Sequence, residues 1–343
     1  MPRNTRLTDR VASDTARGLW VRRRWFLAAV AALYIACGVI AFRLLDRSTL
    51  ERALSLPLTL VAALLALSLV NYLVRAWRWL VLSSFLGFNV PPLRNVLYYL
   101  AGYALTATPG KAGEAVRLWF LKAGHGVPYA RSMAIMLADR ALDMWAVLIL
   151  VLVCFADFSR HLWQGLAMVA IIIVMSVPII FPRMLMPLLG LGLRLAPKRR
   201  RLWVRARRAM HSMADLSHWR TYGLTLVPSV MGWAAEGLAL YLLLRFFGAD
   251  VSAVNAVFVF SFSMIVGASS MLPGGLGSTE VTAVLLLRAL GVDFDAAVAS
   301  TALVRVTTFW FAVGIGVCLL PVAIKAASRS GELRLAAQPR GSS

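Results

Sequence analysis

Seven ionisable side chains lie well inside segments that are otherwise apolar: Glu114, Asp139, Arg140, Asp143, Glu236, Glu280 and Arg305. Charged groups in such segments are costly unless they face the interior of a helix bundle and find partners there. A guanidinium offers bidentate donors to phosphate and stays charged, so we expect Arg140 and Arg305 to bind an anionic group. Glu114 and Glu280 are expected to pair with these arginines or to carry protons. Alternatively, the four residues form internal salt bridges that only fix helix packing.

A Pro-Gly segment precedes each of the two glutamates. The first segment contains Pro109, Gly110 and Gly113, and the second contains Pro273, Gly274, Gly275 and Gly277. Glycine permits tight turns and close backbone approach. An arginine follows 26 residues after Glu114 and 25 residues after Glu280. The helices that follow the turns are expected to present their positive N-terminal ends to an anion, with Ser278 as the N-cap of the second.

Other chemistries lack their motifs. Gly110-Lys111 has neither the earlier Gly nor the following Ser/Thr of a P-loop, and Ser278 follows Gly277 directly, without the spacing of a GxSxG elbow. The four histidines lie in or near predicted loops, and the three cysteines lie in apolar segments without a CxxC pair. We therefore predict no metal site, no cofactor, no catalytic residues and no enzyme activity.

The elements that must position these residues are membrane helices. A hydrophobic fraction of 60% and a mean hydropathy of +0.75 are far above the values of soluble domains. About 20 helical residues cross a hydrocarbon core of about 30 Å. Six stretches are long enough, namely 25–45, 54–75, 129–155, 162–182, 221–247 and 296–323. Two further apolar regions, 94–122 and 254–290, are interrupted by the Pro-Gly segments, and their short arms predict re-entrant hairpins.

The net charge of +21 follows from the predicted topology. With a cytoplasmic N-terminus, the cytoplasmic segments carry 28 of the 36 Lys and Arg residues, and the outside loops carry three. This bias predicts that both termini are cytoplasmic. It also makes a nucleic-acid partner unnecessary, and no nucleic-acid motif is present. The basic segment 183–220 is either a plain cytoplasmic loop or a surface helix on anionic lipid headgroups.

The predicted topology gives the two hairpins opposite orientations. The first, within residues 54–155, enters from the cytoplasm, and the second, within residues 221–323, enters from outside. With the matched Glu and Arg, this inversion predicts an inverted-topology repeat like those of many secondary transporters. A basic cytoplasmic N-terminus, 1–24, and a cytoplasmic tail, 326–343, are expected to flank a single transmembrane domain, 25–325. The predicted fold class is all-α integral membrane, with six spanning helices and two re-entrant Pro-Gly hairpins.

Arg78 lies in a cluster with Arg75, Trp77 and Trp79 at the end of the second predicted span. Tryptophan and arginine at a helix end are typical of interfacial anchors, and we favour that interpretation. The alternative is a basic entrance for lipid headgroups. Together with the other intramembrane charges, this alternative adds further candidates for contact with a substrate: Arg78, Asp139, Asp143 and Glu236.

These motifs together resemble the lysylphosphatidylglycerol synthase transmembrane-region family, a group of flippase-like membrane proteins. The matching features are Arg75–Trp79, Pro109–Glu114 followed by Arg117, Asp139–Asp143, Pro273–Gly277 with Glu280, and Arg305, between about residue 20 and residue 325. Asp139 departs from the pattern, which has Glu at this position. The best-known members carry a soluble synthetase domain, which we do not find in this chain, so aminoacyl transfer is not expected. The resemblance implies transport of an amphiphile with a polar or phosphorylated head, and it adds Arg117 to the candidate substrate-binding residues.

We therefore expect a lipid transporter in the bacterial cytoplasmic membrane. Arg140 and Arg305 are expected to hold the headgroup of a membrane lipid or a polyprenyl-linked substrate. One alternative is an integral-membrane transferase acting on a lipid carrier, with Glu114 or Asp143 as the base. The short outside loops and the almost purely basic cytoplasmic loop argue against it. Another alternative is a non-catalytic membrane partner of a lipid-modifying enzyme.

Overall fold

The structure, a computed structural model, describes residues 47–108, 112–158 and 219–336. Within these ranges the chain is helical and contains no β-strand, which confirms the all-α class there. The predicted spans 25–45 and 162–182 lie outside the described residues. The same is true of the basic segment 1–24, of residues 183–218 of the basic segment 183–220, and of Pro109 and Gly110 in the first turn.

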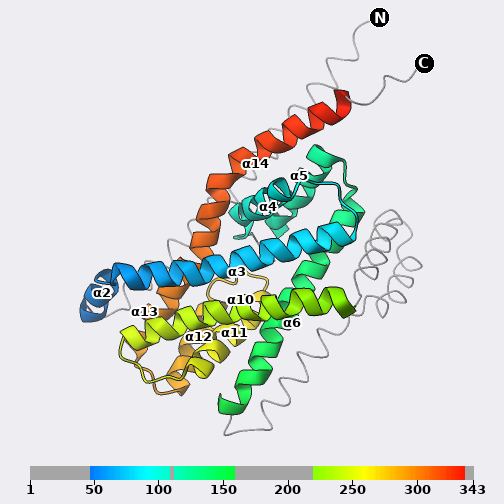
Figure 1. Cartoon of the computed structure of the whole chain (residues 1–343). Coiled ribbons are helices and arrows are strands. Elements are labelled where there is room, and N and C mark those ends of the chain that lie inside the picture. Colours follow the sequence, from blue (N-terminus) through cyan, green and yellow to red (C-terminus); the bar gives the residue numbers. More distant parts are fainter. Residues whose placement is uncertain (1–46, 109–111, 159–218, 337–343) are drawn as a thin grey trace, which may run out of the picture. The chain divides into compact units, whose positions relative to one another are not determined.

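Two groups of helices follow one another along the chain (Figure 1). The first consists of α2 (Arg47–Leu54), α3 (Leu58–Phe85), α4 (Pro92–Ala101), the 3₁₀ segments Gly102–Leu105 and Ala112–Ala115, α5 (Val116–His125) and α6 (Tyr129–Phe158). The second consists of α10 (Trp219–Phe246), α11 (Ala253–Ser269), α12 (Ser278–Ala289), α13 (Phe294–Arg305), the π-helical turn Val306–Trp310 and α14 (Phe311–Ala336). Each group contains the helices of one predicted hairpin: α4 and α5 correspond to the first hairpin, and α11 and α12 correspond to the second.

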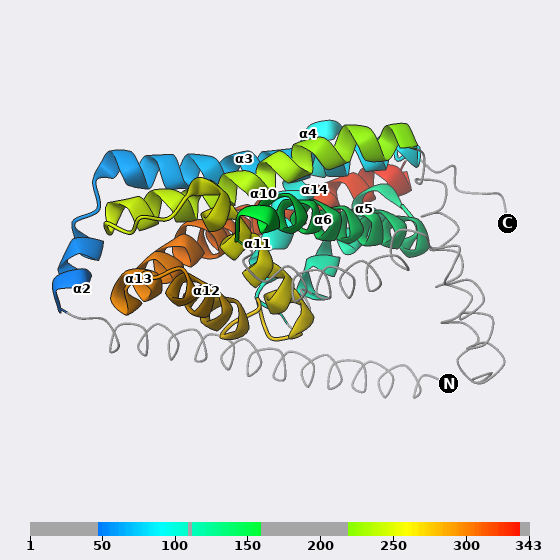
Figure 2. The same cartoon turned by 90° about the horizontal axis from the view of Figure 1, so that it is seen from below.

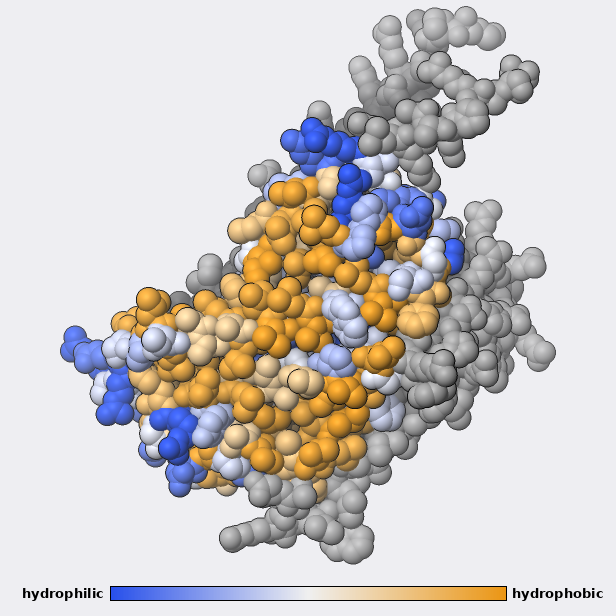
Figure 3. Space-filling model, viewed as in Figure 1, coloured by the Kyte–Doolittle hydropathy of each residue, from blue (hydrophilic) through white to orange (hydrophobic). Residues whose placement is uncertain are grey.

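Three helical stretches in the described ranges are long and apolar enough to cross a bilayer: Leu58–Phe85, Gly223–Phe246 and Phe294–Gly331. Apolar side chains such as Leu73 and Val227 are exposed on their outer faces. Figure 3 shows a surface that is hydrophobic across its middle and hydrophilic toward its ends. Contiguous exposed apolar area of this extent is unfavourable in water and favourable in lipid. The chain is therefore a helical membrane protein.

Two helical stretches extend beyond the predicted spans. Helix α3 covers Leu58–Phe85, whereas the span was predicted at 54–75. The last helical stretch continues to Ala336, past the predicted end at residue 323. A span predicted from hydrophobicity ends at the first charged residues, whereas the helical backbone can continue past them. Helix α3 continues through Arg75 and Arg78 because both side chains find partners inside the protein.

Helices α3 and α10 lie side by side and run antiparallel (Figures 1 and 2). The two hairpins belong to different hydrophobic cores. In one core, Trp79 from the C-terminal half of α3 packs with Tyr99 and Phe120 of the first hairpin. In the other, Leu64 from the N-terminal half of α3 belongs to the cluster that contains Phe258 and Leu287 of the second hairpin. Each hairpin thus packs into its own core, and both halves of the chain contribute residues to both cores.

The turn of the second hairpin requires glycine. Gly274, Gly275 and Gly277 have φ angles of 62°, 69° and 79°, which glycine adopts without steric cost. A Cβ atom on Gly275 would also lie 3.1 Å from the Cα atom of Gly267, where α11 passes close to the turn. The predicted N-cap at Ser278 is wrong. Gly277 is the cap residue, and Ser278, already helical, directs its hydroxyl to the carbonyl oxygen of Gly275 at 3.0 Å.

Candidate functional site

Helices α3 and α6 present complementary charges to each other. Arg75 and Arg78 are three residues apart on α3, so they lie on one face of that helix. Asp139 and Asp143, four residues apart, share one face of α6. The Nη2 atom of Arg75 lies 2.6 Å from Oδ2 of Asp143, and Nη2 of Arg78 lies 2.7 Å from Oδ1 of the same residue. Arg78 Nε also donates to Asp139 Oδ1 at 2.9 Å.

Arg78 is fully enclosed within this network. Its side chain is 0% exposed, and its Nη1 atom donates to the Ser229 hydroxyl of α10 at 2.9 Å. The neighbouring Trp79 is also buried and donates its indole N–H to Asn95 Oδ1 at 2.9 Å. The prediction that Arg78 and Trp79 are interfacial anchors is therefore wrong, because α3 continues past residue 75 and carries both side chains into the protein interior. Trp77 is exposed, as an anchor requires.

Glu114 connects the first hairpin to the same network. Its Oε2 atom lies 2.8 Å from Arg117 Nη1 and 2.9 Å from Arg140 Nη2. Its Oε1 atom accepts a hydrogen bond from the Thr106 hydroxyl at 2.9 Å. Arg140 Nη2 lies 3.1 Å from Asp139 Oδ2 as well. The ion pair between Glu114 and Arg140 that we expected from the sequence is thus present.

The charge bias from which the orientation was predicted remains when three buried arginines are left out of the count. Arg75, Arg78 and Arg117 belong to the predicted cytoplasmic segments, yet all three are buried and paired. Without these three, 25 Lys and Arg residues remain in the predicted cytoplasmic segments against three in the outside loops. The positive-inside bias is still large.

The second hairpin has a corresponding ion pair. Arg305 Nε donates to Glu280 Oε1 at 2.7 Å, and Arg305 Nη2 donates to the carbonyl oxygen of Gly274 at 2.7 Å. The guanidinium carbon lies 4.6 Å from the ring centroid of Phe309 in the π-helical turn. Arg305 therefore joins the second turn to the first residues of α12.

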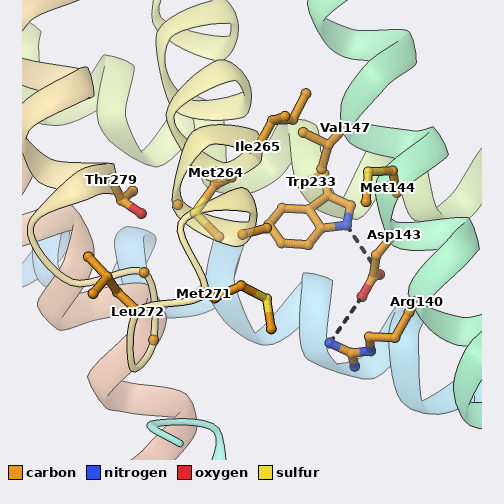
Figure 4. Close-up of a pocket in the computed structure, with 14 residues that line it drawn as sticks. Arg140, Asp143, Met144, Val147, Trp233, Met264, Ile265, Met271, Leu272 and Thr279 are labelled. Carbon is orange, nitrogen blue, oxygen red and sulfur yellow. Dashed lines mark hydrogen bonds and ion pairs between the residues drawn. The ribbon is translucent and has the colours of Figure 1, made fainter. Parts of the chain in front are cut away.

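A pocket of about 190 Å³ is lined by residues of α6, α10 and the second hairpin (Figure 4). Arg140 and Asp143 form its charged wall, where the Trp233 indole N–H donates to Asp143 Oδ1 at 3.3 Å. Thr279, at the start of α12, lies on the opposite side. The aliphatic and thioether side chains of the lining are Met144, Val147, Met264, Ile265, Met271 and Leu272. The pocket is therefore charged on one side and mainly apolar elsewhere.

The structure separates the predicted substrate-binding residues into two sets. Arg140 and Asp143 line the pocket, as do Gly274 and Gly275 of the second turn. The remaining predicted residues do not line it: Glu114, Glu280, Asp139, Glu236, Arg78, Arg117, Arg305, Gly113, Pro273 and Gly277. Most of these hold the elements around the pocket through ion pairs or backbone geometry. Glu236 accepts a hydrogen bond from the Asn71 amide at 2.7 Å, between α10 and α3.

The sequence analysis did not predict three residues of the site, namely Arg75, Trp233 and Thr279. Arg75 had a usable signal, since it lies about one helical turn from Arg78, as Asp139 does from Asp143 in a later apolar span. Trp233 and Thr279 carry no local signal, because an aromatic and a hydroxyl residue are common in membrane helices. Their place in the pocket depends on how α10 and the second turn pack against α6.

The described ranges contain no group of three or more His, Cys, Asp and Glu side chains that could hold a metal ion. The acidic residues that do gather, Glu114, Asp139 and Asp143, are paired with arginines. The charged side of the pocket thus consists of the Arg140 guanidinium and the Asp143 carboxylate, beside a mainly apolar wall.

One family of membrane proteins matches most of the chain. The model of the lysylphosphatidylglycerol synthase transmembrane region matches residues 25–316. The chain belongs to this family. The resemblance drawn from the Pro-Gly turns and the charged helices is thereby confirmed. Membership in the lysylphosphatidylglycerol synthase transmembrane-region family relates this membrane protein to lipid metabolism.

Two relatives of known sequence are named UPF0104 membrane proteins, and both are archaeal. The first, from Methanothermobacter thermautotrophicus, is 26% identical over 272 residues, which cover 71% of this chain and 79% of the relative. The second, from Pyrococcus horikoshii, is 25% identical over 316 residues, which cover 83% of this chain and 94% of the relative. These names state a membrane location and no activity.

Proposed function

We propose that this protein is a flippase-like transporter that moves an amphiphile with a polar or phosphorylated headgroup across the membrane. The pocket between α6 and the second hairpin carries the proposal. Arg140 and Asp143 form one wall of it, and most of the remaining lining is apolar. A headgroup would bind at the charged wall, with acyl or polyprenyl chains along Met264 and Leu272 or in the surrounding lipid. Ionisable residues enclosed in a membrane bundle are typical of substrate pathways.

The two hairpins support an alternating-access mechanism. Each has its own Glu–Arg pair, Glu114–Arg140 and Glu280–Arg305, and each belongs to its own core. Helix α12 begins beside the pocket, where Gly275 is part of the lining, and the positive end of a helix favours an anion. In this proposal the hairpins are re-entrant and enter from opposite faces, as the two halves of an inverted-topology repeat with six spans.

We infer a transport role without a catalytic step, in the cytoplasmic membrane of a bacterium, with both termini in the cytoplasm. The excess of Lys and Arg in the predicted cytoplasmic segments supports this orientation. The substrate would be a membrane lipid or a polyprenyl-linked compound. Anionic headgroups at the cytoplasmic face would bind the basic segment 183–220.

Reconstitution tests the transport function. Purified protein is placed in liposomes that contain fluorescent anionic, zwitterionic or polyprenyl-phosphate lipids, and movement between leaflets is followed by quenching of the outer leaflet. We expect at least one lipid with a phosphate-type anion to move faster than in protein-free liposomes. Arg140→Ala is expected to slow that movement about tenfold to hundredfold, because a charge-assisted hydrogen bond contributes about 1.5–3 kcal/mol.

Arg245→Ala is the matched control for loss of an arginine. Arg245 is exposed, and its Nη1 atom lies 3.5 Å from Asp250 Oδ1, outside the pocket. Exposed pairs contribute about 0–1 kcal/mol, so this variant should transport at nearly the wild-type rate. If no lipid of the panel moves faster than in protein-free liposomes, the transport function is refuted. Transfer of a group to the lipid would instead support the transferase.

A further inference from the structure

Two carboxylates near Arg140 each have an ion pair with another arginine. Glu114 Oε2 lies 2.8 Å from Arg117 Nη1. Asp143 Oδ2 lies 2.6 Å from Arg75 Nη2 and 3.8 Å from Arg140 Nη1. Neither carboxylate depends on Arg140 for its charge partner.

The same is true of Asp139, which accepts hydrogen bonds from Arg78 Nε at 2.9 Å and from Arg140 Nη2 at 3.1 Å. Three arginines other than Arg140 thus pair the three carboxylates of the network, and Arg140 is a fourth cation. Leaving a buried carboxylate without a cation is strongly unfavourable. Arg140 can move to a ligand without causing that loss.

Arg140 is also the arginine that reaches the pocket. Its side chain is 26% exposed, compared with 6% for Arg75, 0% for Arg78 and 1% for Arg117. In Figure 4 it extends from α6 into the pocket, close to Asp143. Its guanidinium is therefore the one that a ligand in the pocket can contact.

Arg305 has the corresponding position in the second half but different surroundings. Its side chain is 7% exposed, and it does not line the pocket. It bonds both Glu280 and the carbonyl oxygen of Gly274. In the described ranges, Arg305 is the sole cation in an ion pair with Glu280. If Arg305 moved to a ligand, Glu280 would lose that cation. The second turn would also lose the hydrogen bond that Arg305 donates to the carbonyl oxygen of Gly274.

We propose that Arg140 binds a phosphate-type anion of the lipid headgroup by exchanging Glu114 for the ligand, and that Arg305 is a positioning residue that holds the second turn. The assignment rests on the transport function proposed above and names its substrate class. A guanidinium matches two phosphate oxygens with parallel N–H donors.

The exchange has a structural consequence for the first hairpin. Glu114 stays bonded to Arg117 and to the Thr106 hydroxyl, so the hairpin keeps its internal contacts. It loses the ion pair between Glu114 and Arg140, which links it to α6. A bound anion thus loosens the first hairpin from α6, the long helix that follows it in the chain.

Ligand binding to the full-length protein in detergent tests the two roles. The probes are inorganic phosphate, dihexanoylphosphatidylglycerol and dihexanoylphosphatidylcholine, and affinity is measured from the increase in unfolding temperature with probe concentration. We expect the phosphatidylglycerol to bind at least about tenfold more tightly than the phosphatidylcholine, since the former alone has a net negative headgroup. Arg140→Ala should abolish this preference. Circular dichroism and gel filtration confirm that the variant is folded.

Two further variants separate ligand contact from positioning. Glu114→Gln should bind phosphatidylglycerol more tightly than the wild type, because a neutral amide competes less for Arg140 and still accepts hydrogen bonds. Arg305→Lys should weaken the binding of both lipid probes to the same extent and keep the preference for phosphatidylglycerol. The reason is that the ammonium can pair with Glu280 but cannot also reach Gly274. Arg245→Ala, the exposed control, should bind like the wild type.

A preference for phosphatidylglycerol that survives in Arg140→Ala, or one that disappears in Arg305→Lys, would overturn the assignment. Inorganic phosphate that binds as tightly as phosphatidylglycerol would refute the lipid class, because the anion would then be a free solute. If the probe binds through Arg140 while no lipid moves in liposomes, the assignment stands and the transport function fails. If lipids move regardless of headgroup charge, the transport function stands and the assignment fails.

Discussion

Replacing Arg78 by alanine is expected to lower the stability of the detergent-purified protein by about 3–5 kcal/mol. Arg78 is 0% exposed and bonds Asp139, Asp143 and Ser229, so its loss removes a cation from two buried carboxylates and leaves a cavity. Thermal unfolding followed by tryptophan fluorescence measures the effect. The unfolding temperature should fall by roughly 2–4 °C for each kcal/mol.

Two comparisons make the Arg78 result specific. Arg245→Ala removes an exposed arginine and should change the unfolding temperature little. Arg78→Lys should recover part of the lost stability, because an ammonium keeps the charge but cannot reproduce the forked hydrogen bonds to Asp139 and Ser229. An unfolding temperature for Arg78→Ala equal to that of Arg245→Ala would show that the network does not stabilise the bundle.

Replacing Gly316 by alanine is expected to destabilise the packing of α14 against the first hairpin by about 1–3 kcal/mol or more. A Cβ atom at this position would lie 2.6 Å from the carbonyl carbon of Tyr103 and closer still to the backbone nitrogen of Ala104. Backbone atoms cannot rotate away as a side chain can. The 3₁₀ segment Gly102–Leu105 would have to move, and with it the hairpin that carries Glu114.

Gly314→Ala, two residues earlier on α14, is the matched control for this substitution. A Cβ atom on Gly314 meets no neighbouring atom within 4 Å. Alanine is also the better helix former by about 1 kcal/mol, so this variant should be as stable as the wild type or more stable. Equal unfolding temperatures for the two variants would contradict the close approach of α14 to the first hairpin.

Two features could be read from the sequence: the class of the molecule, and the ion pair between each hairpin and the helix that follows it. Apolar stretches of bilayer length require helices, and the two Pro-Gly turns interrupt them at recognisable places. The pairs Glu114–Arg140 and Glu280–Arg305 were one of two roles expected for the glutamates, from nearly equal spacings of 26 and 25 residues. Each pair joins a hairpin to the helix that follows it in the chain, so the two residues are close in sequence order as well as in space.

The network between α3 and α6 could not be read in the same way. Arg75 and Arg78 lie beside Trp77 and Trp79 at the end of a predicted apolar span, which is also the pattern of an interfacial anchor. Their partners Asp139 and Asp143 belong to another helix, more than 60 residues later in the chain. Charges that pair across helices are indistinguishable from loop charges until the helices are packed together.

Helix packing also decides the difference between Arg140 and Arg305, which seemed equivalent in the sequence. Their residue type, spacing and intramembrane position made both of them candidate anion-binding groups. Packing made them different: α10 and the second turn leave a pocket beside Arg140, whereas Glu280 and Gly274 enclose Arg305. A side chain's chemistry is encoded locally, but its access to a ligand depends on atoms contributed by distant segments, and that access exists only in the folded bundle.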